Sequence, residues 1–159
     1  MQIEIDSPSA SASRAEACAR ITAALPDWFG LEDANRRYVE DAARYEALAA
    51  RTKDSTIIGL LVYKPIPASS AHPAAIDIHW LGLLPQFHHH GIGTQLIESL
   101  SQLARVRAVP ALTVETLDPS ADDPNYLRTY SFYVKQGFQV CAHFNFGPDN
   151  PAVKMVRPV

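Results

Sequence analysis

Cysteine is scarce in this sequence, and its placement excludes two structural roles. The chain of 159 residues has two cysteines, Cys18 and Cys141, far apart and without the paired spacing of metal or redox sites. A secreted protein held together by disulfides would need more cysteines than this, so the pattern favours free thiols. We therefore expect a cytoplasmic protein.

Long apolar runs and an excess of positive charge are also missing. No stretch approaches the roughly 20 apolar residues that a membrane-spanning helix needs. The first residues include Glu4 and Asp6, where a signal peptide would carry cations and an apolar run. A net charge of −3 argues against binding nucleic acid through a broad basic face. We expect neither a membrane nor a nucleic acid as a partner.

The composition is that of an ordinary globular protein. Hydrophobic residues make up 47% of the chain and charged residues 19%. At this length the chain can bury a substantial core as one domain over residues 1–159. No internal repeat or inter-domain linker interrupts it.

The spacing of apolar residues predicts elements in the order βααβββαβαββ, which indicates a mixed sheet covered by helices. Ser13 and Asp123 are placed to cap two of the helices, and Gly137 to end the last one. The segment 45–51 is alanine-rich, so a continued helix is the alternative to a strand there. Helices are expected over 14–25, 31–43, 91–107 and 125–136, and strands over 1–6, 45–51, 56–64, 75–84, around 112–116, 138–146 and 152–156.

The strand expected over 75–84 has an irregular end. Apolar and polar residues alternate up to Trp80, and the alternation then loses phase over 81–84, where Gly82 lies. A loss of phase with a glycine inside it suggests a β-bulge, which leaves backbone groups unpaired and available to a ligand.

The next segment is the most informative in the chain. The apolar run stops at Pro85, a short loop with Gly91 and Gly93 follows, and a strongly amphipathic helix begins. A strand–loop–helix of this kind directs free backbone N–H groups and the positive end of the helix dipole at one point. This arrangement predicts an anion site, for which a pyrophosphate is the usual ligand.

Two other interpretations of this loop are weaker. Three adjacent histidines, His88, His89 and His90, cannot readily converge on one metal ion, so we expect no metal. A P-loop nucleotide hydrolase would need a Gly-Lys-Ser/Thr ending to hold phosphate and magnesium, and the loop has none.

Two segments of the sequence resemble two motifs of a known family, and they occur in the same order as in that family. The sequence Leu-Gly-Leu-Leu-Pro over 81–85, followed by His-His-His-Gly-Ile-Gly over 88–93, resembles motif A of the GCN5-related N-acetyltransferase (GNAT) family. Ser-Phe-Tyr-Val-Lys-Gln-Gly-Phe over 131–138 resembles motif B of the same family. His88 stands where the family usually has Arg or Gln, and an imidazole has a reference pKa of about 6.5, near neutrality.

The resemblance implies both a fold and a reaction. The fold would be the α/β (α+β) acyl-CoA N-acyltransferase fold, with a mixed, mostly antiparallel central sheet flanked by helices. The reaction would transfer an acetyl group from acetyl-CoA to a primary amine by direct attack in a ternary complex, without a metal. A non-catalytic acyl-CoA-binding or regulatory module on the same fold is the alternative, and a homodimer is the commonest assembly of such domains.

The resemblance also implies where the coenzyme binds. Backbone N–H groups over 88–94 would hold the pyrophosphate, with Gly91 and Gly93 allowing close approach. The pantetheine arm would lie beside 81–84, and the Leu83 N–H would polarise the thioester carbonyl. The family's asparagine position falls on Tyr126, next to Asn125. The expected coenzyme-binding residues are Leu81, Leu83, Leu84, His88, His89, His90, Gly91, Ile92, Gly93, Thr94, Asn125, Tyr130 and Phe132.

Catalysis needs a proton donor and a proton acceptor. Tyr133 occupies the family's tyrosine position and would protonate the departing CoA thiolate, because a phenol is protonated at neutral pH. The alternative is a half-buried aromatic residue on an amphipathic helix. Asp77, His79, Glu115 or a water chain could take the proton of the amine, and the sequence does not choose among them.

The acceptor amine is not identified by the sequence. A polyamine, an amino acid, an antibiotic and a protein N-terminus all fit, and the mildly acidic charge only slightly favours cationic acceptors. Trp28 and Phe29 lie in the break between the first two expected helices, a region that often lines the acceptor site in this family. Core packing is the alternative for both side chains.

Overall fold

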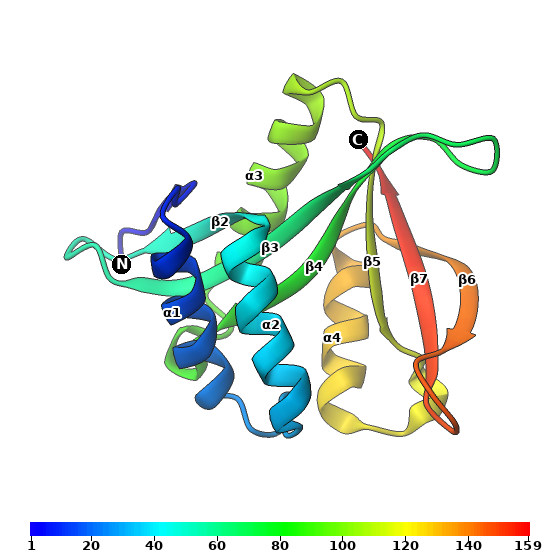
Figure 1. The fold of residues 1–159 in the computed structure, drawn as a ribbon, viewed down its shortest axis with the longest axis horizontal. Coiled ribbons are helices and arrows are strands. Elements are labelled where there is room, and N and C mark those ends of the chain that lie inside the picture. The colour runs from blue at the N-terminus through cyan, green and yellow to red at the C-terminus, as the bar shows by residue number, and fades with distance from the viewer. The chain divides into compact units, whose positions relative to one another are not determined.

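The computed structural model describes residues 1–159, and its elements follow the expected order (Figure 1). The helices are α1 (Ser11–Ala23), α2 (Glu32–Arg44), α3 (Ile92–Val106) and α4 (Pro124–Lys135). The strands are β1 (Glu4–Asp6), β2 (Glu46–Arg51), β3 (Ile57–Ile66), β4 (Ala75–Leu83), β5 (Ala111–Leu117), β6 (Gln139–Asn145) and β7 (Pro151–Pro158). The alanine-rich segment before residue 52 is therefore a strand. No helix is both long and apolar enough to span a bilayer.

The strands form one seven-stranded sheet in the order β1-β2-β3-β4-β5-β7-β6. The pairs β1–β2, β2–β3, β5–β7 and β6–β7 are antiparallel, and β4 pairs with β5 in parallel. A mixed, mostly antiparallel sheet with four flanking helices is the expected fold class, which is confirmed.

The chain divides into two compact units. The first unit comprises residues 1–64 and 79–102, and the second comprises 65–78 and 103–159. Strand β4 and helix α3 contribute residues to both units, so each unit is described separately below.

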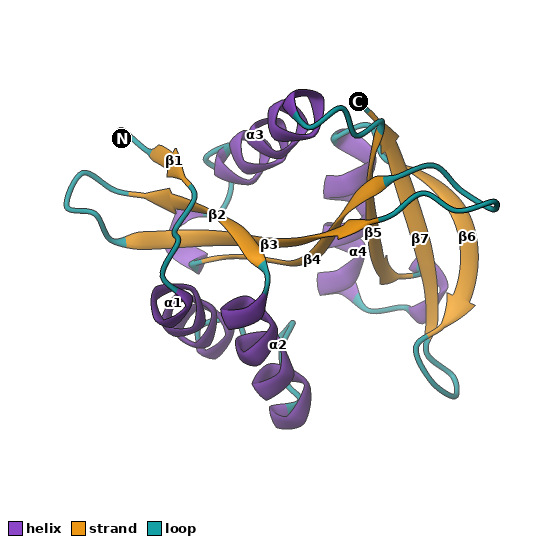
Figure 2. Cartoon of the chain, turned by 45° about the horizontal axis from the view of Figure 1, so that its top comes forward, coloured by secondary structure: helices purple, strands orange, loops and turns teal.

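In the first unit, helices α1 and α2 lie side by side on one face of β2 and β3, and α3 lies on the opposite face (Figures 1 and 2). The Trp80 ring occupies the space above Gly82, where a Cβ would collide with the indole and with Ile21. The buried position 82 therefore requires glycine, because any side chain there would clash with the Trp80 indole. The core on the α1–α2 face is formed by Ala17, Cys18, Ile21, Leu25, Ala42, Ala47, Ala49, Ile57, Leu60, Val62 and Trp80.

One buried cation ties α1 to α2. Arg14 is 9% exposed, and its guanidinium donates only to backbone carbonyls. Nε donates to Ala42 O at 2.9 Å and Nη2 to Ala43 O at 2.8 Å, which satisfies carbonyls in the last turn of α2. Nη1 donates to Pro8 O at 2.9 Å and Ser9 O at 2.7 Å. Arg14 thereby fixes the segment that leads into α1.

The start of α1 differs from the expectation. The helix begins at Ser11 with Ala10 as N-cap and no capping side chain, so the expected cap at Ser13 is wrong. Arg14 N–H already donates to Ala10 O at 3.2 Å, which closes the first helical turn before Ser13 can act as a cap. The Arg14 side chain donates to the carbonyls of Pro8 and Ser9, so it fixes the chain before the helix, but it does not accept from helix N–H groups as a capping side chain does.

The end of β4 also differs from the expectation. Buried and half-buried residues alternate without interruption from Ile76 to Leu83, with Gly82 on the buried side. The expected loss of phase is therefore wrong. The apolar pattern was misleading because Leu81 and Leu83 occupy half-buried positions, while the buried position between them holds a glycine that fits the Trp80 ring.

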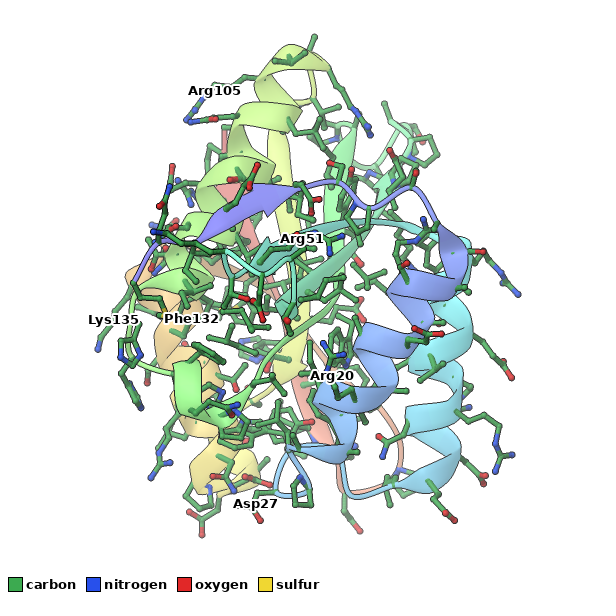
Figure 3. All side chains as sticks on the ribbon, turned by 90° about the vertical axis from the view of Figure 1, so that its left-hand side faces the viewer. Arg20, Asp27, Arg51, Arg105, Phe132 and Lys135 are labelled. Carbon is green, nitrogen blue, oxygen red and sulfur yellow. The ribbon has the colours of Figure 1, made fainter.

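In the second unit, α4 lies beside β5, which pairs with β7, and β7 with β6 (Figure 1). The predicted cap of α4 is confirmed, because Asp123 Oδ1 accepts from the N–H groups of Asn125 at 3.0 Å and Tyr126 at 3.2 Å. Gly137 has φ +87° just after α4, which confirms its role in ending the helix. Phe132 and Lys135 mark the last turns of this helix in Figure 3.

Candidate active site

The segment between β4 and α3 forms a short turn that joins the strand to the helix. Directly after β4, residues Pro85–Phe87 form a short 3-10 turn, closed by Phe87 N–H donating to Leu84 O at 2.9 Å. His88 N–H donates to Pro85 O at 3.1 Å, and Leu84 N–H donates to Ile58 O of β3 at 2.9 Å. The backbone N–H groups of Leu84 and His88 are therefore engaged within the protein.

The residues that follow alternate between positive and negative φ. His89 has φ +62° and Gly91 has φ +75°, with His90 between them at negative φ. This alternation forms the concave backbone arrangement called a nest, which binds anions. The first bond of α3 runs from Gln95 N–H to Gly91 O at 3.1 Å, and no N–H from His89 to Gly93 donates to a backbone carbonyl. We call the backbone from His89 to Gly93 the anion cradle.

The helix dipole of α3 also favours an anion at the anion cradle. The cradle stands at the N-terminus of α3, a helix of 15 residues, where the helix dipole is positive. A Cβ placed on Gly91 would meet nothing within 4 Å, so the backbone there is open to a ligand. The cradle can hold a phosphate or diphosphate without any cationic side chain.

The side chain of His88 points back into the protein. Its Nε2 donates to Leu83 O at 2.7 Å, and its ring meets the Trp28 ring edge-on with centroids 6.0 Å apart. Since a carbonyl can only accept, Nε2 carries the proton. His90 Nδ1 in turn donates to His88 O at 2.7 Å. His88 therefore fixes the shape of the loop by joining it to the end of β4.

The other expected coenzyme-binding residues fall into three groups. Side chains of Leu81, Leu83 and Leu84 are half-buried, and that of Ile92 is buried at 1% exposure, which leaves only its N–H to a ligand. His89, His90, Gly91 and Thr94 are exposed, and Gly93 is half-buried. Asn125, Tyr130 and Phe132 are half-buried on α4, in the second unit.

Tyr133, the expected proton donor, is a buried residue. It is 4% exposed on α4, and its ring meets Phe132 at 5.3 Å and Phe138 at 5.4 Å between centroids. Burial raises the pKa of the Tyr133 phenol well above its usual range, and the charges of Asp77 and Tyr126 act in the same direction. The phenol is therefore held in its protonated form at neutral pH.

The three candidate bases have different surroundings. Asp77 accepts a hydrogen bond from the Thr113 hydroxyl at 2.7 Å. Glu115 is exposed and lies opposite Lys154 in the register of β5 and β7. His79 Nε2 lies 2.7 Å from Asp41 Oδ2, an ion-pairing contact between β4 and α2.

The aromatic residues in the α1–α2 connection pack inward. The Phe29 ring lies 5.8 Å from Tyr38 and 5.5 Å from Trp80, and it packs against the core of the first unit. These contacts favour the core-packing alternative for Phe29. An open hollow of about 550 Å³ begins next to it, lined by Gly30, Leu31, Glu32, Asp33, Ala34 and Arg37.

The sequence analysis missed two residues beside the candidate bases. Asp41 contacts His79, and the Tyr45 ring meets the imidazole edge-on with centroids 5.2 Å apart. The available signal was weak, because Asp41 and Tyr45 are four apart around the end of α2 and only the fold brings them to β4. No group of three His, Cys, Asp or Glu side chains is arranged to hold a metal ion.

The fold and the loop define a class of protein. A mostly antiparallel mixed sheet in which a strand runs into an anion cradle at a helix N-terminus is the framework of a protein that binds a phosphorylated coenzyme. Residues 42–140 match the family model described as the acetyltransferase (GNAT) domain. The chain belongs to the GNAT acetyltransferase family.

Solved structures support the same fold. A protein assigned to the GNAT acetyltransferases from Desulfovibrio desulfuricans superposes with a TM-score of 0.83 at 18% identity, covering 99% of both chains. The PaiA N-acetyltransferase from Thermoplasma acidophilum, solved with coenzyme A, gives 0.70 at 19% identity over 100% of both chains. A GNAT acetyltransferase from Elizabethkingia anophelis with acetyl-CoA bound gives 0.69 at 17% identity, covering 99% of this chain and 98% of that one. Among proteins of curated function, none matches this sequence significantly.

Proposed function

We propose that this protein transfers an acetyl group from acetyl-CoA to a primary amine by direct attack within a ternary complex. The observation that carries the proposal is the anion cradle, whose N–H groups from His89 to Gly93 have no backbone partner. Similar folds from Thermoplasma acidophilum and Elizabethkingia anophelis hold coenzyme A and acetyl-CoA. The diphosphate of the coenzyme is the group that such a cradle fits.

The rest of the coenzyme would contact the end of β4, the strand that leads into the anion cradle. The pantetheine arm would lie beside residues 81–84, and the Leu83 N–H would polarise the thioester carbonyl as negative charge develops on its oxygen. His88 would act as a positioning residue, because its ring joins the loop to Leu83 O. The side chain of Ile92 would take no part, since it is buried in the core.

Tyr133 is the proposed proton donor. When the amine attacks the carbonyl carbon, the C–S bond breaks and the CoA thiolate must gain a proton. Because burial raises the pKa of the phenol, Tyr133 would carry at neutral pH the proton that it donates.

A turnover screen with Tyr133→Phe tests this proposal. Release of the CoA thiol is followed with acetyl-CoA and a library of primary amines that includes polyamines, amino acids, aminoglycosides and peptides. We expect turnover on at least one amine, and a fall in kcat of about 100-fold in Tyr133→Phe with an unchanged Kd for acetyl-CoA. Tyr38→Phe is the control, because it removes the hydroxyl of another tyrosine whose pKa is raised by burial, here a half-buried one on α2.

One result would count against the enzyme, and another would count against its proposed proton donor. Tight acetyl-CoA binding with no turnover on any amine would support a non-catalytic acyl-CoA-binding module. Equal kcat values in the wild type and Tyr133→Phe would remove Tyr133 from the chemistry and leave the acid to solvent.

A further inference from the structure

The contact between Trp28 and His88 joins two segments that are far apart in the sequence. Trp28 lies in the connection between α1 and α2, and His88 lies in the loop between β4 and α3. Their rings meet edge-on with centroids 6.0 Å apart. Figure 3 labels Asp27, the neighbour of Trp28, where the α1–α2 connection passes beside this loop. Both residues belong to the first unit, so the contact lies within one compact part of the chain.

Trp28 is anchored on the side of the helices. Its ring is half-buried and packs against the core on the α1–α2 face, as Phe29 and Leu84 also do. The N–H groups of Trp28 and Phe29 donate to Leu25 O at 3.1 and 3.0 Å. Phe29 O accepts from Asn35 Nδ2 at 2.8 Å, which ties the same connection to α2. The Trp28 ring is therefore a fixed surface against which the His88 ring packs.

The other contacts of His88 lead to the end of β4 and to the anion cradle. Nε2 donates to Leu83 O at 2.7 Å. The imidazole also meets the His89 ring edge-on, with centroids 6.3 Å apart. His88 O accepts from His90 Nδ1 at 2.7 Å. His88 therefore connects Trp28 and the end of β4 to the first two residues of the cradle.

The anion cradle needs support from side chains of this kind. No N–H from His89 to Gly93 donates to a backbone carbonyl, so the ladder of α3 does not hold this segment. His89 has φ +62°, in the left-handed region that a residue with a Cβ occupies only where the surrounding structure holds it. A Cβ on Gly91 would meet nothing within 4 Å, so the cradle is open there. The contacts of His88 support it at the other end, next to His89.

We propose that Trp28 is a positioning residue for the anion cradle and that it acts through the ring of His88. The α1–α2 connection holds Trp28, Trp28 holds the imidazole, and His88 keeps the backbone of His89 in the conformation that binds an anion. Because a hydrogen bond weakens steeply as it bends, rotation of this backbone weakens binding of the diphosphate. This inference rests on the proposed binding of the coenzyme and adds to it a residue from a distant segment.

The effect must operate in both directions. If the contact between Trp28 and His88 favours the binding conformation of the cradle, a bound diphosphate favours that contact by the same factor. Occupation of the cradle is therefore felt in the α1–α2 connection, where Trp28 lies. This reciprocity allows the proposal to be tested from the ligand side and from the tryptophan side.

Calorimetry of Trp28 variants with two ligands tests the ligand side. Pantetheine lacks the diphosphate together with the phosphoadenosine, so it does not engage the cradle. We expect Trp28→Ala to raise the Kd for coenzyme A about 10-fold and to leave the Kd for pantetheine unchanged. Trp28→Phe should restore most of the affinity, because a phenyl ring can still meet the imidazole edge-on. An unchanged Kd for coenzyme A in Trp28→Ala, or an equal rise for both ligands, would overturn the proposal.

Phe29→Leu is the matched control. It removes an aromatic ring from the same connection, but this ring packs against Tyr38 and Trp80. We expect Phe29→Leu to unfold at a lower urea concentration than the wild type, as Trp28→Ala does, without a change in either Kd. A comparable loss of affinity for coenzyme A in Phe29→Leu would mean that general destabilisation explains the effect of Trp28→Ala, and the proposal would fail.

A double-mutant cycle tests whether Trp28 acts through His88. His88→Gln keeps an N–H donor at the end of the side chain but has no ring to meet Trp28. We expect each single variant to bind coenzyme A about 10-fold more weakly and the double variant to bind no more weakly than either, because both remove the same contact. Losses that multiply to roughly 100-fold would show that the two residues act independently, which contradicts the proposal.

Fluorine NMR on the wild type covers variants that fail to fold. Labelling with fluorotryptophan gives two signals, because the chain has two tryptophans, Trp28 and Trp80. Trp80 is 4% exposed, so the signal that responds to exchange of H2O for D2O belongs to the half-buried Trp28. We expect saturating coenzyme A to shift the Trp28 signal and saturating pantetheine to leave it in place.

Two spectroscopic results would overturn the proposal, namely a Trp28 signal that coenzyme A does not shift and one that both ligands shift equally. Binding of coenzyme A without these effects of Trp28 would remove this inference and leave the proposed function intact. Wild-type protein that does not bind coenzyme A would remove both.

Discussion

Single side chains fix the shape of the loop between β4 and α3. His88 is the clearest case, and the sequence alone did not reveal its contacts. His88 was expected to matter because it replaces the Arg or Gln of motif A. The loop of the structure explains how a histidine suits that position, since its Nε2–H reaches Leu83 O and its ring meets Trp28. A sequence motif records which residue type occurs at a position, but it does not show that the side chain points inward.

His89 shows a similar limit. The glycines were expected to supply the unusual backbone geometry of the loop, and Gly91 does so with φ +75°. His89 also adopts positive φ, a conformation in which histidine occurs more often than most residues. A histidine at position 89 tolerates the positive φ of the nest, but the residue type alone does not predict that conformation.

The buried thiol of Cys18 gives a pH-dependent prediction at the residue scale. Burial raises its pKa from 9.0 to about 11, opposed by a hydrogen bond with Thr22 and reinforced by the charge of Asp41. The unfolded chain therefore loses its thiol proton at lower pH than the folded protein does. This stabilisation is fully present below pH 9 and is lost as the pH rises toward 11.

We expect Cys18 to account for about 1 kcal/mol of lost stability between pH 8 and pH 10. Urea unfolding at the two pH values should show this loss in the wild type and a smaller loss in Cys18→Ala. Cys141→Ser is the control, because the thiol of Cys141 is exposed. If Cys18→Ala loses as much stability as the wild type over this range, the thiol does not titrate as described.

At the scale of elements, the periodicity of apolar residues was sufficient to place every helix and strand in order. Helix α4 shows why its ends could also be predicted, because Asp123 and Gly137 act locally through the backbone. Helix α1 shows the converse. Its start depends on the guanidinium of Arg14, which bonds carbonyls of α2, and such a contact leaves no local pattern in the sequence.

The anion cradle gives a prediction at the same scale. Gly91 has φ +75°, and a Cβ there would project into open space where the ligand is expected. Gly91→Ala should weaken coenzyme A binding about 10-fold or more in calorimetry, while strain of the left-handed backbone costs about 1 kcal/mol of folding stability.

Gly137→Ala is the matched control for that experiment. Gly137 also has positive φ, at +87°, but it lies after α4 and outside the anion cradle. It should show a similar loss of stability with an unchanged affinity for coenzyme A. Equal losses of affinity in the two variants would mean that backbone strain, rather than the cradle, governs binding.

At the scale of the whole molecule, the fold class followed from the element order, but the strand order did not. Strand β7 lies between β5 and β6, so the last strand of the chain is inserted beside an earlier one. The contact of Asp41 on α2 with His79 on β4 likewise joins residues 38 positions apart in the sequence. Long-range contacts of this kind carry no periodic signal, which is why the sequence analysis missed Asp41.

Isothermal titration calorimetry with coenzyme A and with pantetheine, which lacks the diphosphate together with the phosphoadenosine, tests the central claim most directly. If the N–H groups from His89 to Gly93 bind the diphosphate, coenzyme A binds without magnesium and pantetheine binds at least about 100-fold more weakly, a difference of roughly 2.7 kcal/mol. Coenzyme A that gives no binding heat and no thermal stabilisation, or pantetheine that binds equally well, would contradict the account.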